Sequence, residues 1–219
     1  MIHVKKFTFN MFYENTYILF DDDSKECAVV DPGCSTDKEE NLISTFIQNH
    51  NLFVKYLINT HCHIDHILGC EFIKQKYNPI YLAPEKDIPL LENASMQADW
   101  VGMDFSISIL PDEFLDENKK LMLGKSAIEF IFTPGHTSGE FCIYCAESNF
   151  CITGDVLFFN SIGRSDLWGG DYDLLLKSIK EKLLILPDNT KIYAGHGEES
   201  TIGREKRENQ FLIHSNEGN

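Results

Sequence analysis

Three histidines and an aspartate fall within residues 61–66, directly after an apolar run, and this cluster restricts the possible fold more than any other feature of the sequence. The run VKYLINT has the length of a buried strand. Residues two apart in an extended segment point to the same side, so His61 and His63 can bind one ion together. Asp65 and His66 are adjacent and diverge by about 100° at the start of a helix, which lets them face a second ion.

Three further polar side chains follow other predicted strands. His136 comes after AIEFIFT, Asp155 ends FCITGD, and His196 comes after KIYAG. Each lies in a turn with glycine, where the backbone can approach a bound ion closely. One histidine at a strand end is more often structural, but five histidines at strand ends or helix starts together favour metal binding. Cys62 alternates with its two histidine neighbours and is expected to point into the packed interior.

The remaining histidines and cysteines carry no such signal. His3, His50 and His214 are expected at the surface. Cys142 and Cys145 form a CxxC, but the segment FCIY is typical of a strand, so buried thiols are predicted rather than a redox or zinc site.

Strand-like and helix-like segments alternate along the chain, which predicts an α/β protein with helices outside a β core. Thr36 and Glu39 form a capping-box pattern at the start of the first helix. Segment 99–116 fits neither pattern clearly. Helices are predicted over 36–47, 66–77 and 171–186, with a further helix starting at Pro84 and a polar helix closing the chain. Strands are predicted over 4–9, 15–20, 26–31, 54–60, 80–83, 127–133, 140–146, 150–155 and 191–195.

Composition narrows the class of protein further. The 219 residues carry a formal charge of −15, with 43% hydrophobic and 24% charged residues. We expect one domain over residues 1–219. The acidic balance argues against a nucleic acid or an anionic membrane as partner. An odd number of cysteines, seven, and an N-terminus without a long apolar stretch predict a cytoplasmic protein with free thiols.

The motifs THCHIDH, PGHTSG, TGD and AGHG, in that order, resemble the metal-binding motifs of the metallo-β-lactamase superfamily. The resemblance implies a four-layer αββα sandwich with a dinuclear metal site at one edge. It implies seven metal ligands: His61, His63 and His136 on one ion, Asp65, His66 and His196 on the other, and Asp155 bridging the two.

Within that superfamily, GDVLFFNSIGRSDLWGGD is similar to glyoxalase II, the hydroxyacylglutathione hydrolases, and its shorter bacterial relatives. The resemblance places Arg164 where a basic residue helps to hold glutathione. Asp166 replaces a tyrosine that also contacts glutathione in that family. Only 23 residues follow His196, so the C-terminal helical domain of full-length glyoxalase II is not expected.

The resemblance implies a metal-dependent hydrolase that cleaves a thioester such as S-lactoylglutathione by attack of a metal-bridging hydroxide. Asp65 and Asp155 would position the two divalent cations, for which zinc is expected first and iron or manganese are alternatives. A small thioester is the expected partner, and the oligomeric state stays open. The alternatives are a mononuclear-iron persulfide dioxygenase, a lactonase or other ester hydrolase, and last a non-catalytic metal-binding module.

Overall fold

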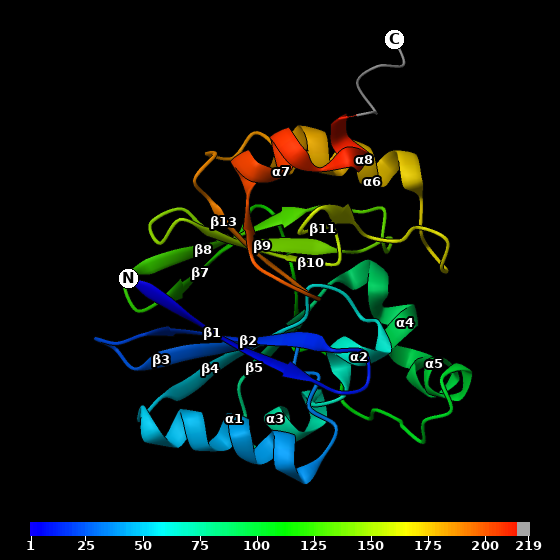
Figure 1. Cartoon of the computed structure of the whole chain (residues 1–219). Helices are drawn as coiled ribbons and strands as arrows, with labels where there is room; N and C mark the ends of the chain where they lie inside the picture. The colour runs from blue at the N-terminus through cyan, green and yellow to red at the C-terminus, as the bar shows by residue number, and fades with distance from the viewer. Residues whose placement is uncertain (214–219) are drawn as a thin grey trace.

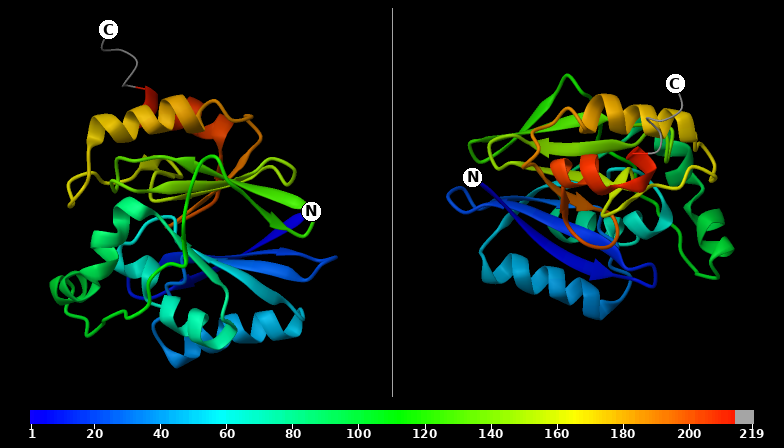
Figure 2. Two further views of the ribbon diagram at one scale, coloured as in Figure 1. Left: turned by 180° about the vertical axis from the view of Figure 1, so that it is seen from behind. Right: turned by 45° about the horizontal axis from the view of Figure 1, so that its top comes forward.

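The computed structural model describes residues 1–213. Two six-stranded sheets pack face to face, and helices cover the outer face of each (Figure 1). The two further views show the same stacking of layers (Figure 2). The predicted four-layer αββα sandwich is therefore confirmed. The predictions that concern residues 214–219, including a surface position for His214, lie outside the described residues.

The first sheet contains the N-terminal strands. Its last three neighbouring pairs are parallel, which requires crossover connections, and helices α1 (Asp37–Asn49) and α3 (Cys70–Tyr77) supply two of them. In spatial order the strands are β1 (Ile2–Phe9), β2 (Glu14–Asp21), β3 (Glu26–Val30), β4 (Phe53–Ile58), β5 (Ile80–Ala83) and β6 (Glu113–Phe114).

The second sheet is antiparallel except where β10 meets β13. A two-stranded hairpin of β11 (Leu157–Phe158) and β12 (Ser161–Ile162) stands beside it. In spatial order its strands are β14 (Ser200–Thr201), β13 (Lys191–Ala194), β10 (Phe150–Gly154), β9 (Phe141–Cys145), β8 (Ser126–Phe132) and β7 (Lys120–Leu123).

The apolar residues pack in three clusters, and alternation along a strand sends its neighbouring side chains into different clusters. On β2, Tyr17 and Leu19 pack in the cluster between the two sheets, while Ile18 and Phe20 pack beneath α1. This is the two-residue period of a strand that is buried on both faces. The third cluster lies between the second sheet and the helices α6 (Tyr172–Ser178), α7 (Ile202–Glu208) and α8 (Gln210–Ile213).

The start of α1 agrees in part with the predicted capping box. Thr36 Oγ1 accepts a hydrogen bond from the backbone N–H of Glu39 at 3.3 Å. The Glu39 carboxylate, however, accepts from the backbone N–H groups of Ser35 and Asn10, both at 2.9 Å. Glu39 therefore ties the helix start to the β1–β2 turn as well as to Ser35, the residue just before the N-cap.

Two predicted helices differ from the structure. The helix expected over 66–77 is divided into α2 (Ile64–Ile67) and α3, because the Gly69 N–H donates to Pro32 O at 2.7 Å and the chain turns there. A Cβ on Gly69 would lie 2.3 Å from Cys34 Sγ, so this close approach requires glycine. The helix expected over 171–186 begins as predicted, but after α6 it continues as a π-helix, η2 (Ile179–Leu183).

Three short helices follow β5 and lie beside the sandwich, at the right in Figure 1. They are the 3-10 helix η1 (Glu85–Asp87), α4 (Ile88–Glu92) and α5 (Ala94–Trp100). All seven cysteines are buried and free, including Cys142 and Cys145 on β9, as predicted. Within residues 1–213, no helix combines the length and the apolar character that crossing a membrane requires.

Candidate metal centre

The structure brings together all seven side chains that the sequence singled out, at one edge of the sandwich. The segment after β4 supplies His61 and His63 and leads into α2 with Asp65 and His66. The loops after β8, β10 and β13 supply His136, Asp155 and His196. Each segment follows the C-terminal end of a strand, which explains how residues so far apart in sequence converge.

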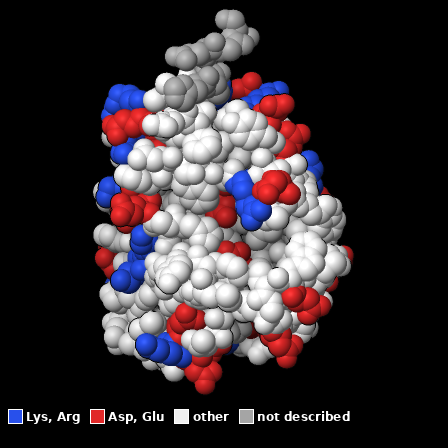
Figure 3. Space-filling view, turned by 45° about the vertical axis from the view of Figure 1, so that its right-hand side comes forward, with Lys and Arg blue, Asp and Glu red and all other residues white. Residues whose placement is uncertain are grey.

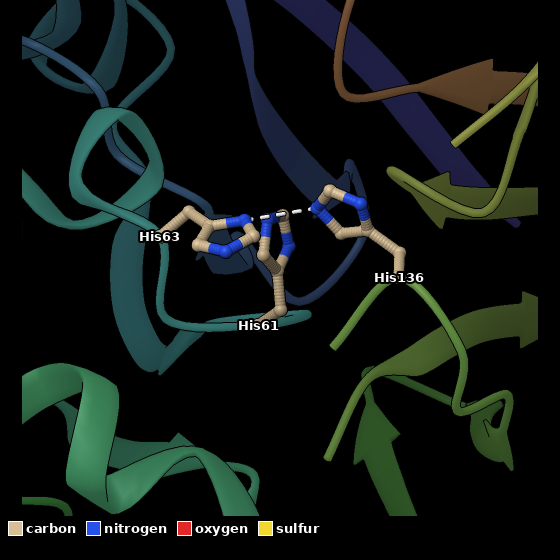
Figure 4. Close-up of side chains that lie close together, drawn as sticks. All are labelled: His61, His63 and His136. Atoms are coloured by element: carbon tan, nitrogen blue, oxygen red, sulfur yellow. Dashed lines mark hydrogen bonds between the residues drawn. The ribbon is translucent and has the colours of Figure 1, made fainter. Parts of the chain in front are cut away.

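His61, His63 and His136 form the first group, with one potential ligand atom from each lying within 4.8 Å of the others. Their rings point toward one another (Figure 4). His63 Nδ1 and His136 Nε2 are 2.9 Å apart, and the three ring pairs meet edge to face. His61 and His136 are almost fully buried.

Asp65, His66 and His196 form the second group by the same measure. Asp65 Oδ2 lies 3.2 Å from His196 Nε2 and 3.7 Å from His66 Nε2. Asp155 stands between the groups: Oδ2 is 3.6 Å from both His136 Nε2 and His196 Nε2, and Oδ1 is 3.5 Å from His66 Nε2. One carboxylate thus faces both groups.

The donor atoms fit divalent cations. His61 Nε2, His66 Nε2 and Asp155 Oδ1 are buried and have no hydrogen-bond partner within residues 1–213. Leaving a buried polar atom without a partner costs about 1–3 kcal/mol, a cost that a bound cation removes. Imidazole nitrogens and carboxylate oxygens are ligands that zinc, iron and manganese accept.

Electrostatics supports the same conclusion. Burial lowers the pKa of His61 and lowers that of His63 to about 3, which keeps their nitrogen lone pairs available. Burial alone would raise the pKa of Asp65, but His66 and His196 outweigh it and hold that pKa well below its usual value. Burial would lower the pKa of His66, yet Asp65 and Asp155 raise it well above normal. The carboxylates around His66 therefore form a site that favours positive charge.

Three of the histidines have one ring nitrogen hydrogen-bonded to the protein, and a fourth has one beside a carboxylate. Nδ1 of His136 lies 2.7 Å from Arg164 O, and Nδ1 of His196 lies 3.1 Å from Phe12 O. Such contacts to carbonyl oxygens fix the ring orientation and leave Nε2 facing the centre. His61 Nδ1 forms a hydrogen bond with Thr60 Oγ1 at 3.1 Å. His66 Nδ1 lies 3.2 Å from Asp31 Oδ2, at ion-pair distance but without hydrogen-bond geometry.

Sequence reasoning missed two buried acids that support the centre. Asp31 accepts from the backbone N–H of Thr60 at 2.7 Å and from its hydroxyl at 2.6 Å. With its oxygens occupied in this way, Asp31 supports His66, although it also lies within 4.8 Å of His61 and His66. Glu140 accepts from the Asp155 N–H at 2.7 Å. Asp31 directly follows β3, so the strand-end signal that identified His136 could have found it too.

Glycine turns permit the close packing that the sequence predicted. A Cβ on Gly195 would lie 2.2 Å from Asp155 Oδ1 and 2.7 Å from His66 Cε1. Gly154, at a φ of +48°, has Glu140 and Thr60 within 3 Å of the position that a Cβ would occupy. Cys62 is buried in the apolar cluster beneath the first sheet, as expected.

The centre opens into a pocket of 790 Å³. His63, Asp65, Asp155 and other site residues form its floor, and Arg164 lies on its wall. Asp166 is not among the residues that line it. It holds the Arg164 guanidinium through two bonds, Nε to Oδ1 at 2.8 Å and Nη2 to Oδ2 at 2.9 Å. The hydrogen bond from Arg164 lowers the pKa of Asp166 to about 2.

Comparisons with known proteins agree with this geometry. The family model described as "Metallo-beta-lactamase superfamily" matches residues 10–196. The hydroxyacylglutathione hydrolase GloC of Haemophilus influenzae is 40% identical over 203 residues, which cover 92% of this chain and 93% of the relative. The crystal structure of the B3 metallo-β-lactamase BLEG-1 aligns with a TM-score of 0.87, 33% identity and coverage of 96% and 99%. That of TTHA1623 in a di-iron-bound form aligns with a TM-score of 0.84, 31% identity and coverage of 95% and 100%.

Proposed function

Because the chain belongs to the metallo-β-lactamase superfamily and carries a metal-binding cluster of histidines and aspartates, we propose that it is a metal-dependent hydrolase that cleaves a thioester of the S-lactoylglutathione kind. The supporting observation is the pair of three-residue groups joined by Asp155 at the floor of one pocket. The resemblance to the Haemophilus influenzae hydrolase supports the thioester.

The proposed ligands are those that the sequence singled out. One ion would be held by His61, His63 and His136, the other by Asp65, His66 and His196, with Asp155 contacting both. Two divalent cations held there would supply a bound water with its pKa lowered toward ~7 and a Lewis acid for the substrate carbonyl. Zinc is proposed first, and the similarity to a di-iron-bound protein keeps iron in consideration.

Charged residues of the chain itself would balance the charges of the cations and of the substrate. Asp65 and Asp155 would supply negative charge against the bound cations and would position them. Water adds to the thioester carbonyl, the C–S bond breaks, and the products are a carboxylate, a thiol and the released proton. Arg164 has five N–H donors, two of which bind Asp166, so the others remain to bind a substrate carboxylate.

The seven buried, free thiols fit the reducing cytoplasm, where we propose the protein acts.

A panel assay tests the proposal. The purified protein is analysed for metal and then given S-D-lactoylglutathione, a lactone, a β-lactam and glutathione persulfide, with oxygen consumption followed for the last. We expect close to two ions per chain and fastest turnover of the thioester. Oxygen consumption with persulfide, one iron per chain and no hydrolysis would replace the proposal with the dioxygenase alternative.

Arg164→Ala is expected to raise KM for S-D-lactoylglutathione about tenfold and to change kcat less, because a contact remote from the carbonyl contributes uniform binding. Steady-state kinetics measures both constants. Arg207→Ala, an exposed arginine on α7 away from the pocket, is the matched control. An unchanged KM would remove Arg164 from the substrate site.

Asp31→Asn is expected to weaken metal binding at the group containing His66 by about 10- to 100-fold, because it removes the negative charge beside His66 Nδ1. Competition with a chromophoric chelator measures the affinity. Asp23→Asn, in the exposed turn between β2 and β3, is the control. Equal affinities in both variants would show that Asp31 supports only the fold.

A further inference from the structure

Both tryptophans of the chain line the pocket at the metal centre, and both are exposed. Trp100 of α5 is 69% exposed and Trp168, in the loop before α6, is 56% exposed. Tryptophan is usually highly buried, since its apolar area is large. Exposing both in one pocket indicates a surface that becomes covered when a ligand binds.

Two other large, partly exposed apolar side chains line the pocket beside the tryptophans. Met96 stands on α5 at 41% exposure, and Phe159 follows β11 at 38%. The side of the molecule that carries α5 is shown in Figure 3, where uncharged residues cover much of the middle, interrupted by one basic and one acidic side chain that lie together and by acidic atoms in the hollows. We define the apolar walls as Met96 and Trp100 on one side and Phe159 and Trp168 on the other.

The α5 wall is fixed to the metal centre. The Gln97 side chain, buried on α5, accepts from the Ile64 N–H at 3.0 Å and donates to Cys62 O at 3.1 Å and Leu90 O at 2.8 Å. Two of these contacts are to the segment that carries His61, His63 and Asp65. Trp100 and Met96 therefore keep a set position relative to the floor, as a specificity wall requires.

Within residues 1–213, the permanent positive charge in the pocket comes from a single side chain. Among the described residues that line it, Arg164 is the sole lysine or arginine, and Asp166 already binds two of its donors. Glu198 on the rim disfavours further anionic groups. The pocket thus suits a ligand with one anionic part near Arg164 and one bulky apolar part.

Building on the proposed thioester hydrolysis, we infer that the acyl group of the substrate is bulky and apolar, an aryl or long alkyl group that packs between the apolar walls. The thiol of a glutathione-type substrate is anionic and belongs near Arg164. The apolar walls are therefore left for the other side of the thioester bond.

A binding experiment tests the apolar subsite without turnover. The probes are S-benzylglutathione and S-methylglutathione, thioethers that cannot be hydrolysed, and the intrinsic tryptophan fluorescence reports only on Trp100 and Trp168. We expect S-benzylglutathione to bind about tenfold more tightly and to change the emission. Equal affinities and unchanged emission would overturn the inference. The tighter binding supports the subsite even if no thioester is hydrolysed, a result that would overturn the proposed function alone.

Hydrolysis rates then show whether the apolar group belongs on the acyl side or the thiol side of the thioester bond. We expect a higher kcat/KM for S-mandeloylglutathione than for S-lactoylglutathione, and Trp100→Ala should lower the first about tenfold more than the second. Phe53→Ala, which removes a 64% exposed aromatic side chain outside the pocket, should change neither. The acyl assignment would be overturned if kcat/KM rose for the lactoyl thioester of benzyl mercaptan, relative to S-lactoylglutathione, but did not rise for S-mandeloylglutathione.

Discussion

Asp155→Ala is expected to lower the metal content from about two ions per chain to less than one and to reduce thioester hydrolysis by roughly 10³-fold or more. The reason is its position: the carboxylate lies within 3.6 Å of histidine nitrogens from both groups. The fold should persist without metal, because the backbone N–H of residue 155 still donates to Glu140. Elemental analysis, initial rates and circular dichroism measure the three effects.

Asp166→Ala is the matched control for this experiment. It removes an aspartate near the same pocket that contacts Arg164 and none of the seven proposed ligands. The control should keep its metal and lose affinity for the substrate. Two tightly bound ions and full activity in Asp155→Ala would show that the centre does not work as a linked pair.

Gly135→Ala is expected to destabilise the fold by about 3 kcal/mol, or roughly 10 °C in Tm for a chain of this size. Gly135 has a φ of +138°, and a Cβ there would lie 2.3 Å from the backbone N and Cα of Leu175 on α6. The substitution would push α6 away from the loop that carries His136. Chemical denaturation of the metal-free protein measures the loss without a contribution from bound ions.

Gly102→Ala separates backbone strain from crowding. Gly102 also has a positive φ, +71°, but a Cβ there would meet nothing within 4 Å. We expect a loss of about 1 kcal/mol from the conformation alone. Equal losses in the two variants would mean that the contact with Leu175 relaxes without cost.

Local patterns predicted the elements of the sandwich and the meeting of the seven side chains. Their signal was positional: each follows an apolar strand or starts a helix, and strand ends collect at an edge of the sheet. That they bind metal stays a prediction, which the Asp155 experiment addresses. Arg164 and Asp166 pair with each other, and their contact with substrate also stays a prediction.

Features that depend on contacts between distant segments could not be predicted in the same way. The break at Gly69 arises from the approach of the loop containing Pro32, which no local pattern contains. The pattern of segment 99–116 favours neither a helix nor a strand. Residues 103–109 within it form no strand, and their apolar side chains pack against the cluster beneath the first sheet. The apolar walls of the pocket combine α5 with a loop some 60 residues later, so only the folded chain reveals them.

The positions of the proposed ligands on two different sheets affect how the protein would unfold. His61, His63, Asp65 and His66 follow a strand of one sheet, whereas His136, Asp155 and His196 follow strands of the other. Ions bound there would act as cross-links across the seam between the two halves, formed late because residues 61 and 196 must first meet. Chelation would then weaken the packing of the two halves and leave the hydrogen bonds within each sheet intact. The bound metal would therefore stabilise the folded protein in addition to its role in hydrolysis.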